Sequence, residues 1–134
     1  GVTIIDDYAH HPVEIRASLA AAKGAATGRV IAVLEPHRYS RLTQQFQDFA
    51  TCCEGADLTI VLPVYAAREV PREGINHETL VEAMKGEVYR CDWPEGLAQL
   101  IQNHARSGDI VVCLGAGSIS ALAHALPMQL NQFS

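Results

Sequence analysis

Short apolar runs alternate along the chain with longer segments in which apolar residues recur every three or four positions. The runs are rich in Val, Ile and Leu and predict strands over 2–5, 29–34, 58–62, 88–91 and 109–114. The periodic segments predict helices over 12–23, 42–53, 76–85 and 94–104, then one after Ser118, with a frayed tail from Pro127. This alternation is typical of an α/β fold: a doubly wound, mostly parallel, Rossmann-like sheet with helices on both faces.

Polar residues cluster directly after four of the five predicted strands. Right-handed crossovers bring the carboxyl ends of parallel strands to one edge of a sheet, where ligands bind in open α/β folds. We therefore expect the clusters at 6–11, 35–41, 63–71 and 115–118 to face a single crevice.

The first cluster holds two carboxylates, a phenol and two imidazoles. Asp6 and Asp7 could cap a turn, accept the hydroxyls of a ribose, or help to hold Mg²⁺. Tyr8 could form the wall of a small pocket or stack on a base. His10 and His11 could be structural or bind a ligand, and zinc is disfavoured because no cysteine or third histidine stands at ligand spacing.

The second cluster contains His37, Arg38 and Arg41. Two arginines three positions apart share one face of a helical turn, and each can hold a carboxylate or phosphate through paired hydrogen bonds. They could also be a solvated helix start. However, positive charge at a helix N-terminus opposes the helix dipole, so we predict that an anion compensates it. In the next loop, Arg68 and Glu69 could form a pair or a lid.

The last cluster, Gly115-Ala116-Gly117, resembles half of a phosphate-binding turn before a helix. It lacks the third glycine of a dinucleotide fingerprint and the Lys-Ser/Thr of a Walker loop. A GxSxG nucleophile context is also missing from the sequence.

Composition narrows the class of protein. The 134 residues suit one domain, and a net charge of −5 argues against a general nucleic-acid or anionic-membrane surface. No apolar run approaches the roughly 20 residues of a membrane span, and no export signal is visible. The four cysteines lack CxxC pairing, which predicts reduced, buried thiols in a cytosolic protein. Because the chain begins inside a strand, we expect a domain cut from a longer polypeptide.

The segment Asp7-Tyr8-Ala9-His10-His11-Pro12 resembles the D-Y-[AG]-H-x-P signature of the C-terminal domain of the Mur ligase superfamily, which includes folylpolyglutamate synthases. The segments at 36–41 (PHRYSR), 64–67 (VYAA) and 115–117 (GAG) are most similar to the members that join L-alanine to UDP-N-acetylmuramate. This resemblance implies a cytoplasmic, ATP-dependent amide-bond ligase of peptidoglycan synthesis. In that family the muramate carboxylate is phosphorylated and the alanine amine then attacks the acyl phosphate.

The resemblance also implies roles for individual residues. The nucleotide ribose would be contacted by Asp7 with its neighbour Asp6, the alanine carboxylate by Arg38 and Arg41, and the rest of the alanine by Tyr8, His10 and His37. ATP and Mg²⁺ would be bound mainly by a central ATPase domain. Neither that domain nor the UDP-binding domain of the family matches residues 1–134, so we expect this chain alone to be inactive and to contain no metal ligand.

The sequence departs from the family at Glu35, where glutamine is more common, and at Arg68, near which the family has a glycine. It also departs at Ser118 and Ser120, where Asp or Asn and then Gly are usual. Two alternatives stay open. One is the ligase that recycles a murein tripeptide, which shares the D-[YF]-A-H-H-P motif. The other is a non-catalytic nucleotide-binding α/β module.

Overall fold

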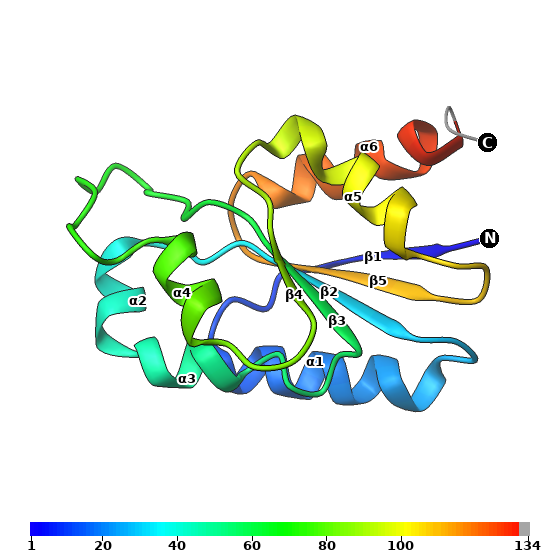
Figure 1. Cartoon of the computed structure of the whole chain (residues 1–134), viewed down its shortest axis with the longest axis horizontal. Helices are drawn as coiled ribbons and strands as arrows, with labels where there is room; N and C mark the ends of the chain where they lie inside the picture. The colour runs from blue at the N-terminus through cyan, green and yellow to red at the C-terminus, as the bar shows by residue number, and fades with distance from the viewer. Residues whose placement is uncertain (132–134) are drawn as a thin grey trace.

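The computed structural model describes residues 1–131 and contains a five-stranded sheet in the order β1-β5-β2-β3-β4 (Figure 1). Every neighbouring pair of strands is parallel, which confirms the predicted α/β class. The strands are β1 (Thr3–Asp7), β2 (Val30–Leu34), β3 (Leu58–Val61), β4 (Val88–Arg90) and β5 (Ile110–Leu114).

Helices cover both faces of the sheet (Figure 1). One face carries α1 (Pro12–Ala25), α2 (Tyr39–Gln44), α3 (Phe46–Thr51) and α4 (His77–Ala83). The other carries the 3₁₀ turn η1 (Pro94–Gly96), α5 (Leu97–His104) and α6 (Ile119–Asn131). None of the helices in the described part of the chain is long and apolar enough to cross a membrane.

The central strand β2 is buried along its whole length because both of its faces are covered. Its alternate residues divide between two cores. Ala32 and Leu34 pack with Leu19 and Phe49 under the first helical layer. Ile31 and Val33 belong to the second core, with the apolar residues of α5 and α6.

The prediction of one helix over 42–53 is wrong. The segment forms two short helices with a break at Gln45, whose backbone leaves the helical region (φ −121°, ψ 30°). The change of direction lets Leu42 and Phe49 both bury completely. The first of the two helices also begins three residues earlier, at Tyr39. Apolar spacing alone does not register such a break, because the same faces stay buried.

The expectation of a frayed tail from Pro127 is also wrong for the described residues, since α6 runs through Pro127 to Asn131. Proline removes one helical hydrogen bond, but tertiary burial opposes that cost. Leu126 is buried and Leu130 packs against the second core. The remainder of the predicted tail, 132–134, lies outside the described residues.

Candidate functional site

The carboxyl ends of the parallel strands share one edge of the sheet, opposite the N-terminus in Figure 1. As predicted, loops from different strands meet there. The His10 and His37 ring centroids are 5.6 Å apart, so the first and second clusters are in contact. Tyr8 lies against His10 at 5.6 Å, and Tyr65 stacks on His37 at 5.3 Å. Four rings from three loops therefore form one continuous row.

The first turn of α1 fixes the start of this row. Pro12 is the first helical residue, as predicted, and Glu14 Oε1 accepts hydrogen bonds from the backbone N–H groups of His11 (3.2 Å) and His10 (3.3 Å). These two bonds lower the pKa of the Glu14 carboxyl. His10 Nδ1 lies 3.0 Å from the Tyr8 carbonyl oxygen. With the proton on Nδ1, this contact leaves Nε2 free to accept a hydrogen bond.

The two aspartates at the end of β1 are held differently. Asp7 Oδ1 accepts a hydrogen bond from Ala9 N at 2.9 Å and so caps the turn. Asp6 Oδ2 accepts one from Ser120 Oγ at 2.6 Å and lies 3.2 Å from His124 Nε2, both on α6. Within residues 1–131, the second carboxylate oxygen of Asp7 has no hydrogen-bond partner, so this residue can cap the turn and still accept a ribose hydroxyl.

The N-terminus of α2, at the second cluster, already contacts an anionic side chain. Glu69, from the loop after β3, accepts hydrogen bonds from Ser40 N (3.0 Å) and from Ser40 Oγ. The bond from the Ser40 hydroxyl and then that from the Ser40 amide lower the pKa of Glu69, which favours its charged form. The anion inferred from the dipole of α2 is thus part of the chain, and the dipole argument does not by itself require a ligand. Glu69 binds Ser40 and forms no ion pair with Arg68.

A second observation does point to a ligand. Arg41 Nη1 and His37 Nδ1 are buried, and neither has a hydrogen-bond partner within the described part of the chain. The same holds for Gln45 Oε1 at the end of α2. A buried polar atom left without a partner costs about 1–3 kcal/mol, so such atoms usually meet a ligand or water. Burial, followed by the nearby His10, Arg41 and Arg38, lowers the pKa of His37 and favours its neutral form.

Arg38 sits at the N-cap of α2 with φ 72° and ψ 136°, a conformation that costs energy for any residue other than glycine. Its backbone N–H donates to the Tyr65 carbonyl oxygen at 2.8 Å, and Tyr65 N donates to Pro36 O at 2.8 Å. These bonds join the end of β2 to the loop after β3. They fix the backbone of Arg38 relative to that of Tyr65.

Glu35 is a residue of this edge that our sequence reasoning did not assign. It is buried, and its carboxylate accepts hydrogen bonds from Ser118 Oγ (2.6 Å) and Ile119 N (3.3 Å). Burial raises the pKa of Glu35. The available signal was a carboxylate that directly follows a fully apolar strand, together with the departures at Glu35 and Ser118.

The glycine turn after β5 packs against the same group of residues. A Cβ atom at Gly117 would lie 2.6 Å from the Tyr65 ring and 2.9 Å from Glu35 Oε1. Gly117 is therefore needed for close packing between the last turn and the row of rings, whatever its suitability for phosphate. Tyr65 was likewise not assigned by sequence reasoning.

An open cavity of about 510 Å³ adjoins the row of rings. Its walls are formed by Arg38, Tyr65, Ala66, Ala67 and Arg68. Of the residues predicted for the site, Arg38 alone lines this cavity. Tyr8 is strongly exposed at the far end of the row, so the structure brings the predicted residues to one edge without enclosing them together.

One group at this edge has the composition of a metal site. The ligand atoms of His10, His11 and Glu14 lie within 4.8 Å of one another. Two imidazoles and a carboxylate suit zinc or a similar ion. However, Glu14 already accepts two backbone hydrogen bonds, and the group stands at the positive end of α1. Both features weaken its affinity for a cation.

Comparison with known proteins identifies relatives of nearly the whole chain. The family model described as "Mur ligase, glutamate ligase domain" matches residues 1–117. Proteins named UDP-N-acetylmuramate--L-alanine ligase from Methylorubrum extorquens and Brucella anthropi are 52% and 53% identical over 97% and 98% of the chain. The chain spans 29% of the length of each of these relatives.

A similar fold occurs in a solved structure, that of UDP-N-acetylmuramate-alanine ligase from Thermotoga maritima. The two superpose with a TM-score of 0.76 over 99% of this chain and 27% of the other, at 23% sequence identity. At that level of identity the likeness supports the fold.

Proposed function

Because this chain belongs to the Mur ligase family by its match to the glutamate ligase domain, we propose that it is the amino-acid-binding C-terminal domain of an ATP-dependent ligase that joins L-alanine to UDP-N-acetylmuramate. The names of its relatives at 52–53% identity support this reaction. The structural observation that carries the proposal is a pair of buried nitrogens, on Arg41 and His37, that have no partner among residues 1–131 and lie at the edge where open α/β sheets bind ligands.

In this proposal the carboxylate of alanine binds between Arg38 and Arg41. The guanidinium group of Arg41 contributes Nη1, and a carboxylate would supply the charged hydrogen bond that this atom does not form with any residue in 1–131. Arg38 lies three residues away, at the start of the same helix. The strained backbone of Arg38 is consistent with a residue whose position is set by binding.

The rings complete the pocket. His37 favours the neutral state, so it does not repel the ammonium group of alanine, and its buried Nδ1 can accept a hydrogen bond from that group. Tyr8 and His10 continue the row and restrict the space around the methyl group. A small pocket of this kind rejects larger amino acids by steric clash.

In the proposed reaction, ATP would supply the phosphoryl group that activates the muramate carboxylate, and Mg²⁺ would accompany the nucleotide. Asp7, with Asp6 beside it, is placed to contact the ribose, because Asp7 keeps one carboxylate oxygen free of hydrogen bonds within residues 1–131. We assign the phosphates and the metal mainly to parts of the ligase outside residues 1–134. The contribution of this chain is to hold the amine in reacting geometry, which is an orientation effect. The four buried, free thiols agree with a cytoplasmic location.

A ligation assay tests the proposal. A full-length ligase carrying this chain is incubated with ATP, Mg²⁺, UDP-N-acetylmuramate and either L-alanine or the murein tripeptide, and ADP release and product mass are followed. We expect the alanine adduct to dominate, and no turnover by residues 1–134 alone. A preference for the tripeptide would select the recycling ligase, and absence of any adduct would favour a non-catalytic nucleotide-binding module.

A further inference from the structure

Arg68 has no role in the site described so far. The neighbouring residue, Glu69, holds the start of α2 through Ser40. Arg68 itself is exposed, and its guanidinium forms neither an ion pair nor a hydrogen bond with any residue in 1–131. It lines the cavity of about 510 Å³ together with Arg38 and Tyr65.

The backbone around this cavity is strained. Across the described residues, left-handed φ angles at positions other than glycine occur at Arg38 (72°), Ala67 (49°) and Arg68 (75°). All three line the cavity. Glycine adopts such angles at lower cost, and strain of this kind is retained mainly at ligand sites. The presence of arginine at position 68, where glycine would be less strained, therefore suggests that the guanidinium group has a function.

The charge of the cavity indicates what it would bind. Two arginines line it and no carboxylate does, although the chain as a whole carries a net charge of −5. Like charges that share a cavity repel each other, so an anion bound between them is favoured. The planar guanidinium group pairs with a phosphate or a carboxylate through two parallel hydrogen bonds.

The size of the cavity favours a phosphate-bearing ligand over the carboxylate of a single alanine. Sites for small molecules have volumes of about 300–1,000 Å³, and this cavity lies within that range. A single alanine would fill only a small part of it. The unpartnered Arg41 nitrogen, to which we assign the alanine carboxylate, belongs to a residue that does not line the cavity.

We propose that Arg68 is a third anion-binding arginine, which lies beside Arg38 in this cavity and holds a phosphate group of a substrate. The assignment of this phosphate to ATP or to the nucleotide sugar rests on the function proposed above, since both of those substrates carry phosphates. Phosphate binding at the cavity itself does not rest on it.

The first test measures binding of inorganic pyrophosphate to the 134-residue chain by calorimetry. Arg68→Gly removes the guanidinium and suits the observed φ of 75°, so the fold is retained. We expect the dissociation constant to rise about tenfold, as for the loss of one charged hydrogen-bond partner. Arg68→Lys, which keeps the charge, should lose less. Melting temperatures of the variants confirm that each is folded.

A matched control removes a guanidinium from the opposite edge of the sheet. Arg106 is exposed, and it is its backbone N–H that donates to the Asp109 carboxylate, so Arg106→Ala keeps that hydrogen bond. The variant changes the net charge by the same amount as Arg68→Gly. Its affinity for pyrophosphate should stay within twofold of the original. Equal losses in the two variants would mean a general charge effect and would overturn the proposal, as would unchanged binding by Arg68→Gly.

The second test identifies the source of the phosphate. Dissociation constants of ADP, UDP-N-acetylmuramate and L-alanine are measured for the full-length ligase with and without Arg68→Gly. We expect one of the two phosphate-bearing ligands to weaken about tenfold and alanine to be unaffected. A loss confined to alanine would overturn the proposal. A failure of the ligation assay would overturn the proposed function, yet it would leave the pyrophosphate result standing.

Discussion

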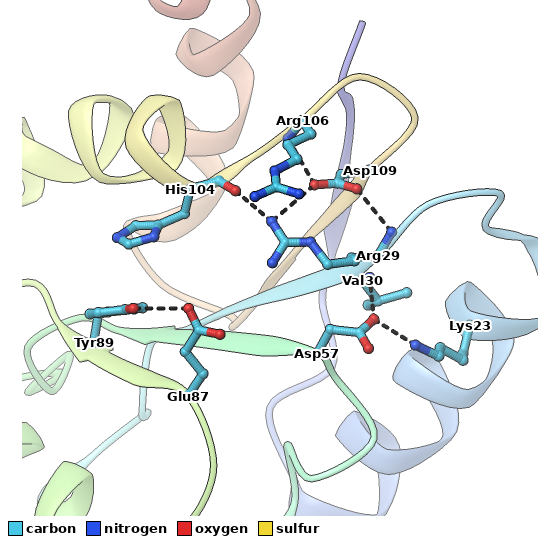
Figure 2. Close-up of polar contacts among 9 residues, drawn as sticks. All are labelled: Lys23, Arg29, Val30, Asp57, Glu87, Tyr89, His104, Arg106 and Asp109. Atoms are coloured by element: carbon cyan, nitrogen blue, oxygen red, sulfur yellow. Dashed lines mark hydrogen bonds and ion pairs between the residues drawn. The ribbon is translucent and has the colours of Figure 1, made fainter.

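The two edges of the same sheet differ in how completely their buried polar atoms are paired. At the amino ends of the strands, charged groups pair with one another and with the backbone, from the buried Asp109 to the exposed Lys23 (Figure 2). At the carboxyl ends, three buried polar atoms, on His37, Arg41 and Gln45, lack partners within residues 1–131, and the backbone is strained. Both edges belong to one continuous parallel sheet, so the difference does not arise from the architecture. The amino edge therefore helps to hold the fold together, and the carboxyl edge is where we propose that ligands bind.

Asp109 is the centre of the amino edge. Its carboxylate accepts hydrogen bonds from Arg106 N (2.8 Å) and Arg29 N (2.9 Å), and the Arg29 guanidinium approaches it at 3.5 Å (Figure 2). Burial raises the pKa of the Asp109 carboxyl, but these contacts outweigh burial and lower it. Close by, Asp57 joins Lys23 Nζ (2.5 Å) to Val30 N (2.8 Å). Each of these charged groups has a structural partner.

Asp109→Ala should have the largest effect on stability. It leaves two backbone amides and the Arg29 guanidinium without their carboxylate, which should lower the free energy of unfolding by about 3 kcal/mol. Urea denaturation measures the change. Asp48→Ala is the matched control, because the Asp48 carboxylate makes no hydrogen bond within the described residues, and it should stay within about 0.5 kcal/mol. Equal effects in the two variants would contradict the importance of the amino edge.

Substitutions at Glu35 test how a buried carboxylate contributes to stability at the carboxyl edge. Glu35→Ala removes the acceptor for Ser118 Oγ and Ile119 N and should lower the free energy of unfolding by about 1–2 kcal/mol. Glu35→Gln keeps an oxygen for Ile119 N and can donate to the Ser118 hydroxyl, so it should cost less. Chemical denaturation near neutral pH compares them. A Gln variant as unstable as the Ala variant would show that the charge of Glu35 stabilises the fold.

Two buried carboxylates, Asp109 at the amino edge and Glu35 at the carboxyl edge, should respond to pH with opposite signs. The pKa of Asp109 is lowered below 3.8, so its contribution is present above that value and is lost as pH falls. The pKa of Glu35 is raised above 4.5, so ionisation makes the folded state less stable as pH rises through the window above 4.5. Asp109→Asn should be less stable than the parent near neutral pH, and this difference should disappear in acid. Glu35→Gln should become more stable relative to the parent as pH rises. Denaturation at a series of pH values measures both differences, and slopes of the same sign would contradict the assignment.

The smallest expected effect concerns strain at Arg38. Arg38→Gly and Arg38→Ala both remove the guanidinium group, but only glycine relaxes at φ 72°. We expect Arg38→Gly to be more stable than Arg38→Ala by roughly 1 kcal/mol, after allowance for the greater freedom of glycine in the unfolded chain. Thermal unfolding of the two variants gives the difference. Equal stability would show that the carboxyl edge carries no strain at this residue.

Much of the fold could be predicted because its signals are local. The Val- and Ile-rich runs marked the strands, and the alternation with helices gave a doubly wound sheet. The break at Gln45 could not be predicted, since Leu42 and Phe49 keep a helical spacing across it. The continuation of α6 past Pro127 depends on burial of Leu126, which is a tertiary effect.

Convergence of the site could also be predicted, because parallel strands bring their carboxyl ends together, and His10 does meet His37. Its details depend on long-range contacts that no local pattern records. Glu69 reaches back 29 residues to Ser40, and Glu35 reaches forward 83 residues to Ser118. The dipole argument predicted an anion at α2, but it could not tell a ligand from a carboxylate of the chain itself.

The most direct test of the account is the Michaelis constant for alanine in the full-length ligase carrying Arg41→Ala. We predict that it rises by roughly tenfold to a hundredfold, while the constant for ATP stays unchanged, because the alanine carboxylate would lose the guanidinium whose buried Nη1 has no partner among residues 1–131. Arg16→Ala on α1, which removes an exposed guanidinium bound to Thr51, is the control and should leave both constants unchanged. An unaltered constant for alanine in Arg41→Ala would contradict the assignment of the amino-acid site to this edge.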